Sequence, residues 1–211
     1  RVYNLNESYK DHFKSYDFHN LYKELLNFCT VDLSAFYFDI RKDSLYCDPK
    51  ESTKRKNSII VLNIILESLL KWFAPILSFT TEEIFTLLNK EKKSIHLEEF
   101  IKFPKSFENI KLNEKWIELK KIRDICNISI EAKRTSKEIG SSLEANLTIN
   151  INNEQSNFIE NIDLAELCIT SKVNIIKTND KEIKVETIKA EGKKCPICWK
   201  ISKDRCQRHS T

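Results

Sequence analysis

Apolar residues recur at steps of three and four through the first part of the chain, which is the period of one face of a helix. The first such stripe, which Leu25 and Phe28 widen, comprises Phe18, Tyr22, Leu26, Cys29, Leu33, Phe36 and Ile40. The residue before a proline avoids helical dihedral angles, so we expect this element to end at Asp48-Pro49. The pattern therefore predicts one long amphipathic helix.

A second helix is predicted over residues 52–73. Its polar residues Asn63, Glu67 and Lys71 are four apart and mark one narrow solvent-facing stripe, while its other faces are apolar. We therefore expect a central helix that neighbouring elements cover on most sides. Pro75 should break or kink this helix.

A third, shorter helix is predicted over residues 81–88. Thr80 should be its N-cap residue, and the Glu83 side chain should reach back to complete a capping box. Residues 95–103 are typical of an extended segment that leaves the helices. Together, the patterns in residues 1–104 predict a helical bundle.

The second part, residues 105–190, begins with one long helix. This helix is predicted over residues 114–139 and should stop at Gly140. Its apolar stripe comprises Ile122, Ile125, Ile128 and Ala132, with Trp116, Leu119 and Cys126 beside it. We expect the helix to cover the strands that follow.

Alternation with a period of two predicts the clearest strand of the chain, over residues 143–152. Its apolar positions are Leu143, Ala145, Leu147, Ile149 and Ile151. A short helix near residues 157–167 should follow, and then strands around 168–176 and 182–188, with Asn179-Asp180 marking the turn between them. The second part is therefore predicted to be a small α+β unit, and the chain as a whole to be mainly α.

Composition excludes several kinds of site. The two glycines, Gly140 and Gly192, are too few for a P-loop, a dinucleotide-binding fingerprint or a nucleophile elbow. The chain has no Met and opens on Arg1, so we expect it to be a piece of a longer protein. Its longest apolar run, residues 59–73, is too short and too often interrupted by polar residues to span a bilayer.

Charge leaves nucleic-acid binding open, and the placement of histidines gives catalysis no support. The chain has 35 Lys and Arg against 31 Asp and Glu, a net charge of +4. That excess permits a nucleic-acid partner, but a solvated surface rich in both signs explains it equally well. No nucleophile stands at a telling spacing from His12, His19, His96 or His209, and the carboxylates are scattered. We therefore nominate no catalytic residue.

The seven cysteines do not form a disulfide framework, because their number is odd and their spacing is irregular, and we expect a reducing, cytoplasmic environment. In residues 191–211, Cys195, Cys198, Cys206 and His209 have the spacing of two metal-binding pairs. These ligands suit one tetrahedral zinc ion, with Zn–S distances of about 2.3 Å, better than copper or an iron–sulfur cluster. Two alternatives remain. One is four unconnected residues in a frayed terminus; the other is a Cys-x-x-Cys redox site, which the second ligand pair and the surrounding lysines disfavour.

Basic residues form three groups that suit contacts with phosphates. Arg41 and Lys42 lie at the end of the first helix and Lys54, Arg55 and Lys56 at the start of the second, so one connection brings them close together. The third group, on the long helix, comprises Lys120, Lys121, Arg123, Lys133, Arg134 and Lys137. A merely solvated position is the alternative for each of these residues.

Three aromatic residues offer rings that could stack on unpaired bases. They are Tyr37, Tyr46 and Trp199. For Tyr37, packing in the core is the better interpretation.

Three segments resemble signatures of the C-terminal region of bacterial isoleucyl-tRNA synthetases. They are DLSAFYFDIRKDSLYCD at residues 32–48, EIGSSLEA at 138–145 and KCPICWK at 194–200. They occur in the family's order and together span nearly the whole chain. The terminal zinc motif is what points to the isoleucine family among the related synthetases for isoleucine, valine and leucine.

The resemblance implies a class I synthetase that activates isoleucine with ATP, transfers it to isoleucine tRNA and hydrolyses mischarged valine. The present chain would hold a helical anticodon-binding domain (residues 1–104), a small α+β junction domain (105–190) and a zinc-binding tail (191–211) with one structural Zn²⁺. The family's nucleotide-binding signatures are absent. ATP and Mg²⁺ would therefore bind only in a missing catalytic domain. The protein would be a cytoplasmic monomer.

Carried onto this chain, the resemblance assigns Cys195 and Cys198 to the first zinc pair and Cys206 to the third ligand position. His209 stands where the family usually has Cys, and the interval between the two pairs is shorter than usual. Arg41 and Lys42 fall in the matching helical signature and are nominated as tRNA contacts. Together with residues from the basic groups and the aromatic beside the zinc pair, the predicted tRNA contacts are Arg41, Lys42, Lys54, Arg55, Lys56, Lys133, Arg134 and Trp199. Alternatives are the zinc-finger end of a formamidopyrimidine-type DNA glycosylase and a stand-alone zinc-containing RNA-binding module.

Overall fold

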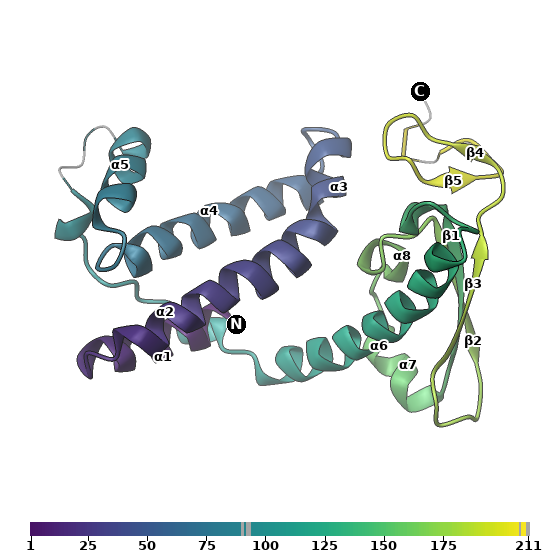
Figure 1. Ribbon diagram of the computed structural model, residues 1–211, viewed down its shortest axis with the longest axis horizontal. Helices are drawn as coiled ribbons and strands as arrows, with labels where there is room; N and C mark the ends of the chain where they lie inside the picture. The colour runs from purple at the N-terminus through teal and green to yellow at the C-terminus, as the bar shows by residue number, and fades with distance from the viewer. Residues whose placement is uncertain (90, 92–93, 207, 210–211) are drawn as a thin grey trace. The chain divides into compact units, whose positions relative to one another are not determined.

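The computed structural model describes residues 1–89, 91, 94–206 and 208–209, so Gln207, Ser210 and Thr211 of the predicted tail lie outside the described residues. The chain forms two compact units, Arg1–Asn109 and Ile110–Thr211 (Figure 1). Helices build the first unit, and the second combines helices with a small sheet. The predicted mainly α fold class is confirmed.

The first unit consists of helices joined by short turns. Its α-helices are α1 (Val2–Lys14), α2 (Phe18–Asn27), α3 (Asp39–Cys47), α4 (Thr53–Phe73) and α5 (Ser78–Leu88). A π-helical segment, η1 (Phe28–Phe38), joins α2 to α3, and two single 3₁₀ turns, η2 (Ile95–Leu97) and η3 (Lys105–Phe107), follow α5. The helix predicted to end at Asp48-Pro49 is confirmed as the continuous run α2–η1–α3.

The stripe predicted for that run was wrong in its first half. The exposed residues there are Phe18, Tyr22 and Leu26. The buried ones are Leu21, Leu25, Phe28 and Leu33. Leu33, and Leu25 and Phe28 that widen the predicted stripe, are confirmed as buried, whereas Leu21 was not predicted. The step of five from Phe28 to Leu33 crosses η1, where hydrogen bonds run from i to i+5.

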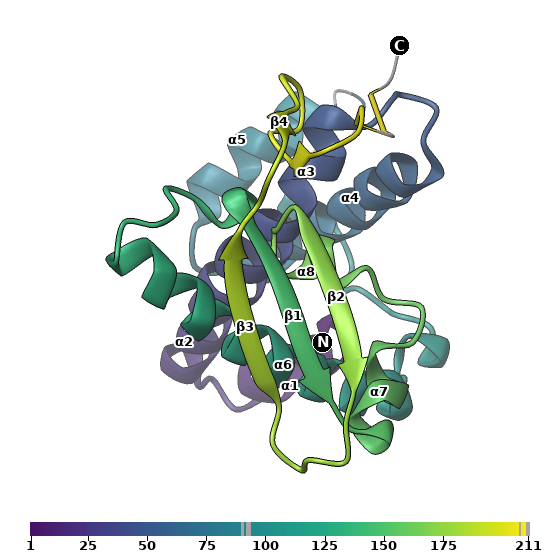
Figure 2. The same cartoon turned by 90° about the vertical axis from the view of Figure 1, so that its right-hand side faces the viewer.

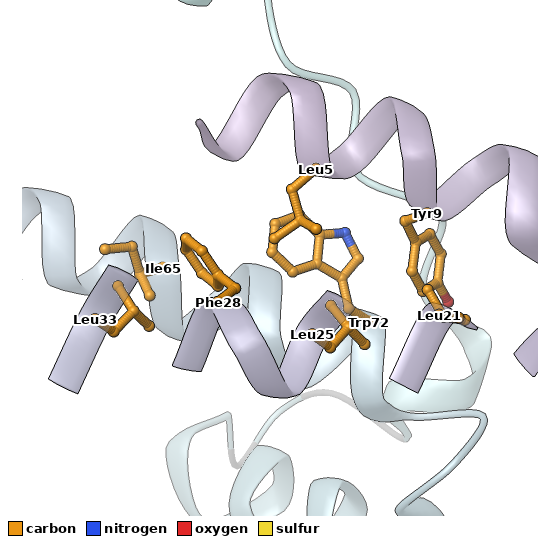
Figure 3. Packing of buried hydrophobic residues seen from close by; sticks show 8 residues of the cluster. All are labelled: Leu5, Tyr9, Leu21, Leu25, Phe28, Leu33, Ile65 and Trp72. Atoms are coloured by element: carbon orange, nitrogen blue, oxygen red, sulfur yellow. The ribbon is translucent and has the colours of Figure 1, made fainter. Parts of the chain in front are cut away.

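The core of the first unit gathers around Trp72. Figure 3 shows this cluster of buried side chains, which comprises Leu5, Tyr9, Leu21, Leu25, Phe28, Leu33, Ile65 and Trp72. The Trp72 indole Nε1 donates a hydrogen bond of 3.1 Å to Asn6 Oδ1, and Asn6 Nδ2 donates one of 3.1 Å to the Ile101 carbonyl. Trp72 and Asn6 are each 1% exposed. These bonds join α4, α1 and the segment after η2 through polar groups that water does not reach.

Helix α4 matches its predicted length but is not covered on most sides. The Ser52 hydroxyl accepts a hydrogen bond from the Arg55 N–H and caps the start, and the helix ends two residues before Pro75. Within the first unit, however, the side chains of four apolar residues are 38–56% exposed. They are Ile59, Ile60, Val61 and Leu66. The expectation of a central, enclosed helix was wrong, because α4 has apolar residues on more faces than this unit covers.

Helix α5 begins earlier than predicted, and its predicted capping box was wrong. Its first residue is Ser78 and its N-cap is Leu77, whose side chain makes no capping bond. The carboxylate of Glu82 instead accepts hydrogen bonds from Ser94 Oγ and the Ile95 N–H, at 2.9 and 3.0 Å. An acidic residue is therefore used to order the following turn, η2, where an extended segment was expected.

Raising the pH should remove a stabilising contribution of Tyr9. Its ring packs on Phe13, Trp72 and Phe100, and its buried hydroxyl has no hydrogen-bond partner among the described residues. Burial raises the pKa of Tyr9 to about 12, above the ordinary value of about 10. The contribution is complete below pH ~10 and is lost as the pH rises towards ~12, by at most about 3 kcal/mol.

Denaturant unfolding of the wild type and Tyr9→Phe at several pH values measures this effect. The variant cannot ionise and keeps the ring, so its stability should fall less between pH ~10 and ~12 than that of the wild type. Parallel losses in the two proteins would show that ionisation of Tyr9 is not the cause.

The described residues of the second unit form one long helix, two short helices and two sheets. Its helices are α6 (Ile110–Thr135), the 3₁₀ turn η4 (Ser142–Glu144), α7 (Asn153–Ile159) and α8 (Leu164–Leu167). Its strands are β1 (Ala145–Ile151), β2 (Lys172–Lys177), β3 (Lys184–Lys189), β4 (Lys193–Lys194) and β5 (Ile201–Ser202). The first three strands form a sheet in the order β2-β1-β3, and β4 and β5 form an antiparallel hairpin beyond one end of it (Figure 2).

Helix α6 covers one face of the three-stranded sheet. Strand β1 is parallel to β2 and antiparallel to β3, with Leu147 opposite both Val173 and Thr187. Alternate residues of β1 are buried, which confirms its predicted pattern. The α6 residue Ser129 bonds across to β3, through its hydroxyl to the Val185 carbonyl at 3.2 Å and to Thr187 Oγ1 at 2.6 Å.

Two details of the second unit were predicted wrongly. Helix α6 ends at Thr135 rather than at Gly140, and the residue in the left-handed conformation is Lys137, with φ of 59°. The helix predicted over residues 157–167 is divided into α7 and α8 by a turn at Asn161, which also has positive φ. Non-glycine residues adopt this conformation less often, so glycine placement alone did not locate the turns.

The buried side of α6 also differs from the predicted stripe. Its buried residues are Leu119, Ile122, Cys126 and Ile130. Ile128 is 72% exposed, and Ala132 is exposed as well.

Among the described residues, no helix combines the length and apolarity needed to cross a bilayer.

Candidate metal centre and nucleic-acid interface

The β4–β5 hairpin folds the Cys-x-x-Cys segment into a tight turn. The Cys195 N–H donates to the Lys200 carbonyl at 2.9 Å, and the Trp199 N–H donates to the Cys195 carbonyl at 3.0 Å. Trp199 lies in the left-handed region, with φ of 62°. This reversal of the chain buries both Cys195 and Cys198 at the turn.

The four predicted ligands meet at this turn. Their ligand atoms all lie within 4.8 Å of one another. His209 Nδ1 is 3.5 Å from both Cys195 Sγ and Cys206 Sγ, and Cys198 Sγ is 3.8 Å from Cys206 Sγ. A tetrahedral ion with bonds of about 2.3 Å to sulfur and 2.0 Å to nitrogen requires S···S and S···N separations of about 3.8 and 3.5 Å. The donor set and its spacing therefore fit a tetrahedral metal ion.

The surroundings shift the pKa values of the Cys195 and Cys198 thiols in opposite directions. Burial disfavours the Cys195 thiolate, but hydrogen bonds from the Cys198 and Ile197 N–H groups outweigh burial and lower the pKa of Cys195 to about 6. Burial, with the neighbouring Cys195 and Cys206, raises the pKa of Cys198 to about 12. Binding of a metal ion at neutral pH would therefore have to displace the proton of Cys198.

Substitution of Gly192 tests how tightly the hairpin is built. Gly192 has φ of +127°, and a Cβ there would lie 2.1 Å from the Ser202 carbonyl oxygen. We expect Gly192→Ala to force the two strands apart and to weaken metal binding roughly 5- to 100-fold, the range that corresponds to local backbone strain. Competition titration against a chromophoric chelator measures this loss.

Gly140→Ala is the matched control, because a Cβ at Gly140 would meet the Glu144 carboxylate at an ordinary 3.5 Å. Its metal affinity should equal that of the wild type. Equal affinities for all three proteins would show that close approach at Gly192 is not needed for the site.

Trp199 and Lys194 form an exposed cation–π pair beside the metal centre. Trp199 is 59% exposed, and Lys194 Nζ lies 5.3 Å from the centroid of its ring. Sequence analysis did not single out Lys194, because this contact depends on the chain reversal between β4 and β5. The pair places a positive charge against one side of the indole, an arrangement suited to contacts with both a phosphate and a base.

The structure places the basic residues of the first unit around the α3–α4 connection. Arg41 and Lys42 belong to α3, and Lys54, Arg55 and Lys56 to the first turn of α4. Arg55 is not available as an open cation, because its Nη1 donates to the Asp48 carbonyl at 2.8 Å. Lys42 pairs with Asp39 at 2.7 Å, but its side chain remains 55% exposed.

The remaining predicted contacts belong to the second unit. Lys133 pairs with Glu138, and Arg134 pairs with Glu131, each at 2.8 Å. Of the aromatic candidates in the first unit, Tyr37 packs against the Trp72 core cluster, whereas Tyr46, at the end of α3, is 85% exposed. Tyr37 is therefore a core residue, and Tyr46 remains accessible.

Comparison with known proteins associates the chain with translation. The family model for the anticodon-binding domain of tRNA ligase matches residues 1–149. An isoleucine–tRNA ligase from Pelagibacter ubique is 71% identical over 100% of this chain and 23% of the relative. The ligases from Bartonella henselae and Methylacidiphilum infernorum are each 40% identical over 95% of this chain and 21% and 22% of their own lengths. The chain thus spans less than a quarter of the curated relatives that it matches.

Proposed function

The chain belongs to the family of anticodon-binding domains of tRNA ligases, and on that premise we propose that it is the tRNA-binding C-terminal part of an isoleucine–tRNA ligase. The observation that carries the proposal is the match over residues 1–149, together with an accessible basic connection in the first unit. The whole enzyme would join isoleucine to its tRNA with ATP and Mg²⁺ and remove mischarged valine. Those reactions would take place in parts of the protein outside this chain. The whole enzyme would be a monomer in the cytoplasm.

Isoleucine tRNA is the proposed partner of the α3–α4 connection. Arg41, Lys42, Lys54 and Lys56 would contact phosphates of the anticodon stem-loop. Arg55 would act indirectly, since its guanidinium holds the end of α3. Lys133 and Arg134 are secondary candidates, because they belong to the last turn of α6 rather than to the α3–α4 connection.

Zinc is the proposed occupant of the metal centre, as one structural ion per chain. Three thiols and one imidazole in tetrahedral spacing suit zinc, and the ion would order a hairpin that has little apolar core of its own. The ion would hold Trp199 towards the RNA without taking part in a reaction. The family match supports this reading over the alternative of a DNA glycosylase.

A binding assay at matched salt tests the proposal. The chain should bind an isoleucine tRNA transcript more tightly than duplex DNA or the same tRNA with an exchanged anticodon, at each of several salt concentrations. The double variant Lys54→Gln, Lys56→Gln should weaken tRNA binding and make the salt dependence shallower by about one unit per lost contact. Equal binding of tRNA and duplex DNA would contradict the proposal.

The matched control is Lys102→Gln. Lys102 belongs to the same unit but lines a surface pocket with Glu67 and Lys71, in the second half of α4, and its side chain is 82% exposed. This variant should bind tRNA with wild-type affinity and an unchanged salt dependence.

A further inference from the structure

We propose that Ser171 is a positioning residue that fixes the direction of the metal-binding β4–β5 hairpin relative to the three-stranded sheet. The hairpin lies beyond the edge of the sheet where β1 starts and β3 ends, as Figure 2 shows, so its direction decides where Trp199 and Lys194 project from the second unit. The importance of that direction for RNA binding rests on the proposed function. The positioning role itself rests on contacts within the second unit.

The Ser171 hydroxyl joins three separate segments of the chain. Its Oγ donates a hydrogen bond of 2.5 Å to the Leu143 carbonyl and accepts one of 2.6 Å from the Ile201 N–H. Leu143 lies just before β1, Ser171 just before β2, and Ile201 in β5. One hydroxyl therefore acts as donor to the sheet side and as acceptor from the hairpin side.

The backbone on the sheet side of Ser171 is held independently of the hydroxyl. The Ser171 N–H donates to the Ala145 carbonyl at 3.1 Å, which continues the pairing of β1 with β2. The Ala190 N–H donates to the Glu144 carbonyl at 2.7 Å, at the end of the β1–β3 pairing. Removal of the hydroxyl should therefore leave the sheet intact while releasing its bond to β5.

On the hairpin side, Ile201 is tied closely to the metal ligands. Its neighbour Lys200 accepts the Cys195 N–H through its carbonyl, and Ile201 lies opposite Lys194 in the β4–β5 register. A bond to the Ile201 N–H therefore acts on the strand next to the first ligand and next to Trp199. The hydrogen bonds of Ser171 described above involve none of the four ligand atoms. Loss of the Ser171 hydroxyl should therefore change the direction of the hairpin more than it changes metal binding.

The experiment uses the whole chain loaded with Co²⁺, whose pseudocontact shifts on sheet amides report the direction of the hairpin. Ser171→Ala should retain one Co²⁺ per chain but show reduced shifts at β1 and β3, because the hairpin then samples several directions. Amide exchange at Ile201 should become at least ~10-fold faster, since its N–H has lost its acceptor. Ser171→Thr, which keeps a hydroxyl, should restore both measurements.

Ser129→Ala is the matched control. It removes a hydroxyl that also bridges two elements of the second unit, α6 and β3, but does not contact the hairpin. It should lower stability without altering the shifts or the exchange at Ile201. Wild-type shifts and wild-type Ile201 exchange in Ser171→Ala would overturn the proposal. If metal is not taken up, exchange at Ile201 relative to the amides of β1 decides the question alone.

Binding of isoleucine tRNA separates this inference from the proposed function. Ser171→Ala should lose affinity to the same extent as Trp199→Ala, roughly 5- to 150-fold for one lost stacking contact, while keeping its metal. A wild-type chain that does not bind tRNA would refute the proposed function, and the Co²⁺ and exchange measurements would still decide the role of Ser171.

Discussion

Replacing Cys195 by serine should reduce the zinc in the purified chain from one equivalent to a small fraction of one. Cys195 supplies the thiol whose pKa is about 6, so its loss removes the ligand that is ready to bind at neutral pH. A serine hydroxyl remains protonated and binds zinc poorly. Removing a residue that only hydrogen-bonds to a metal ligand can lower metal affinity by roughly 100-fold. Removing the ligand Cys195 itself should lower the zinc affinity by more than that. Elemental analysis after dialysis against a chelator measures the change.

The matched control is Cys29→Ser in the first unit. Burial raises the pKa of the Cys29 thiol, and Cys29 is not a member of the four-ligand cluster. Its zinc content should remain at one equivalent. A Cys195→Ser chain that also keeps a full equivalent would show that the cluster at the hairpin is not the zinc site. If the His209→Ala chain keeps its zinc whereas the Cys195→Ser chain loses it, a water molecule would take the fourth ligand position.

Replacing Trp72 by alanine should unfold the first unit at ordinary temperature. Trp72 is 1% exposed and contacts α1 as well as the α2–η1 run, so truncation would open a large cavity at the centre of the unit. Substitutions of this kind cost about 3–5 kcal/mol. The loss of the indole N–H would also leave Asn6 Oδ1 without its 3.1 Å partner, at a further cost of about 1–3 kcal/mol. Together these losses approach the whole stability of a typical domain.

Urea unfolding followed by circular dichroism measures this loss, and two variants interpret it. Trp72→Phe keeps most of the ring but not the N–H, so it should lose much less stability than Trp72→Ala. Trp116→Ala, a partly exposed tryptophan of α6, should affect the second unit and leave the first unchanged. If Trp72→Ala unfolded at the wild-type urea concentration, Trp72 would not hold the core together.

Local patterns predicted the elements better than they predicted the faces of those elements. The alternation in β1 survives because a strand has a period of two whatever packs against it, and its buried residues are as expected. The faces of α2 and α6 were misplaced because several helical stripes compete, and tertiary packing decides which is buried. The start of α5 was missed because its N-cap residue, Leu77, makes no side-chain capping bond, so no polar N-cap residue marks where the helix begins.

The metal centre was easier to predict than its surroundings. The spacing of Cys195, Cys198, Cys206 and His209 is visible in the sequence, because these ligands come as two short pairs of the types and spacing typical of structural zinc sites. The contacts of Ser171 with Leu143 and Ile201 join residues 28 and 30 positions apart. No local pattern reveals such contacts, since they depend on how β1, β2 and the hairpin meet.

The π-helical segment η1 also affects how α3, which follows it, is rotated about the helix axis. An α-helix turns by about 100° per residue, so a more loosely wound stretch changes the angular phase at which α3 begins. The direction in which Arg41 and Lys42 face is therefore decided by the eleven residues before α3 as well as by α3 itself. A single deletion within η1 would therefore rotate the basic side of α3 about the helix axis while leaving every residue of α3 in place.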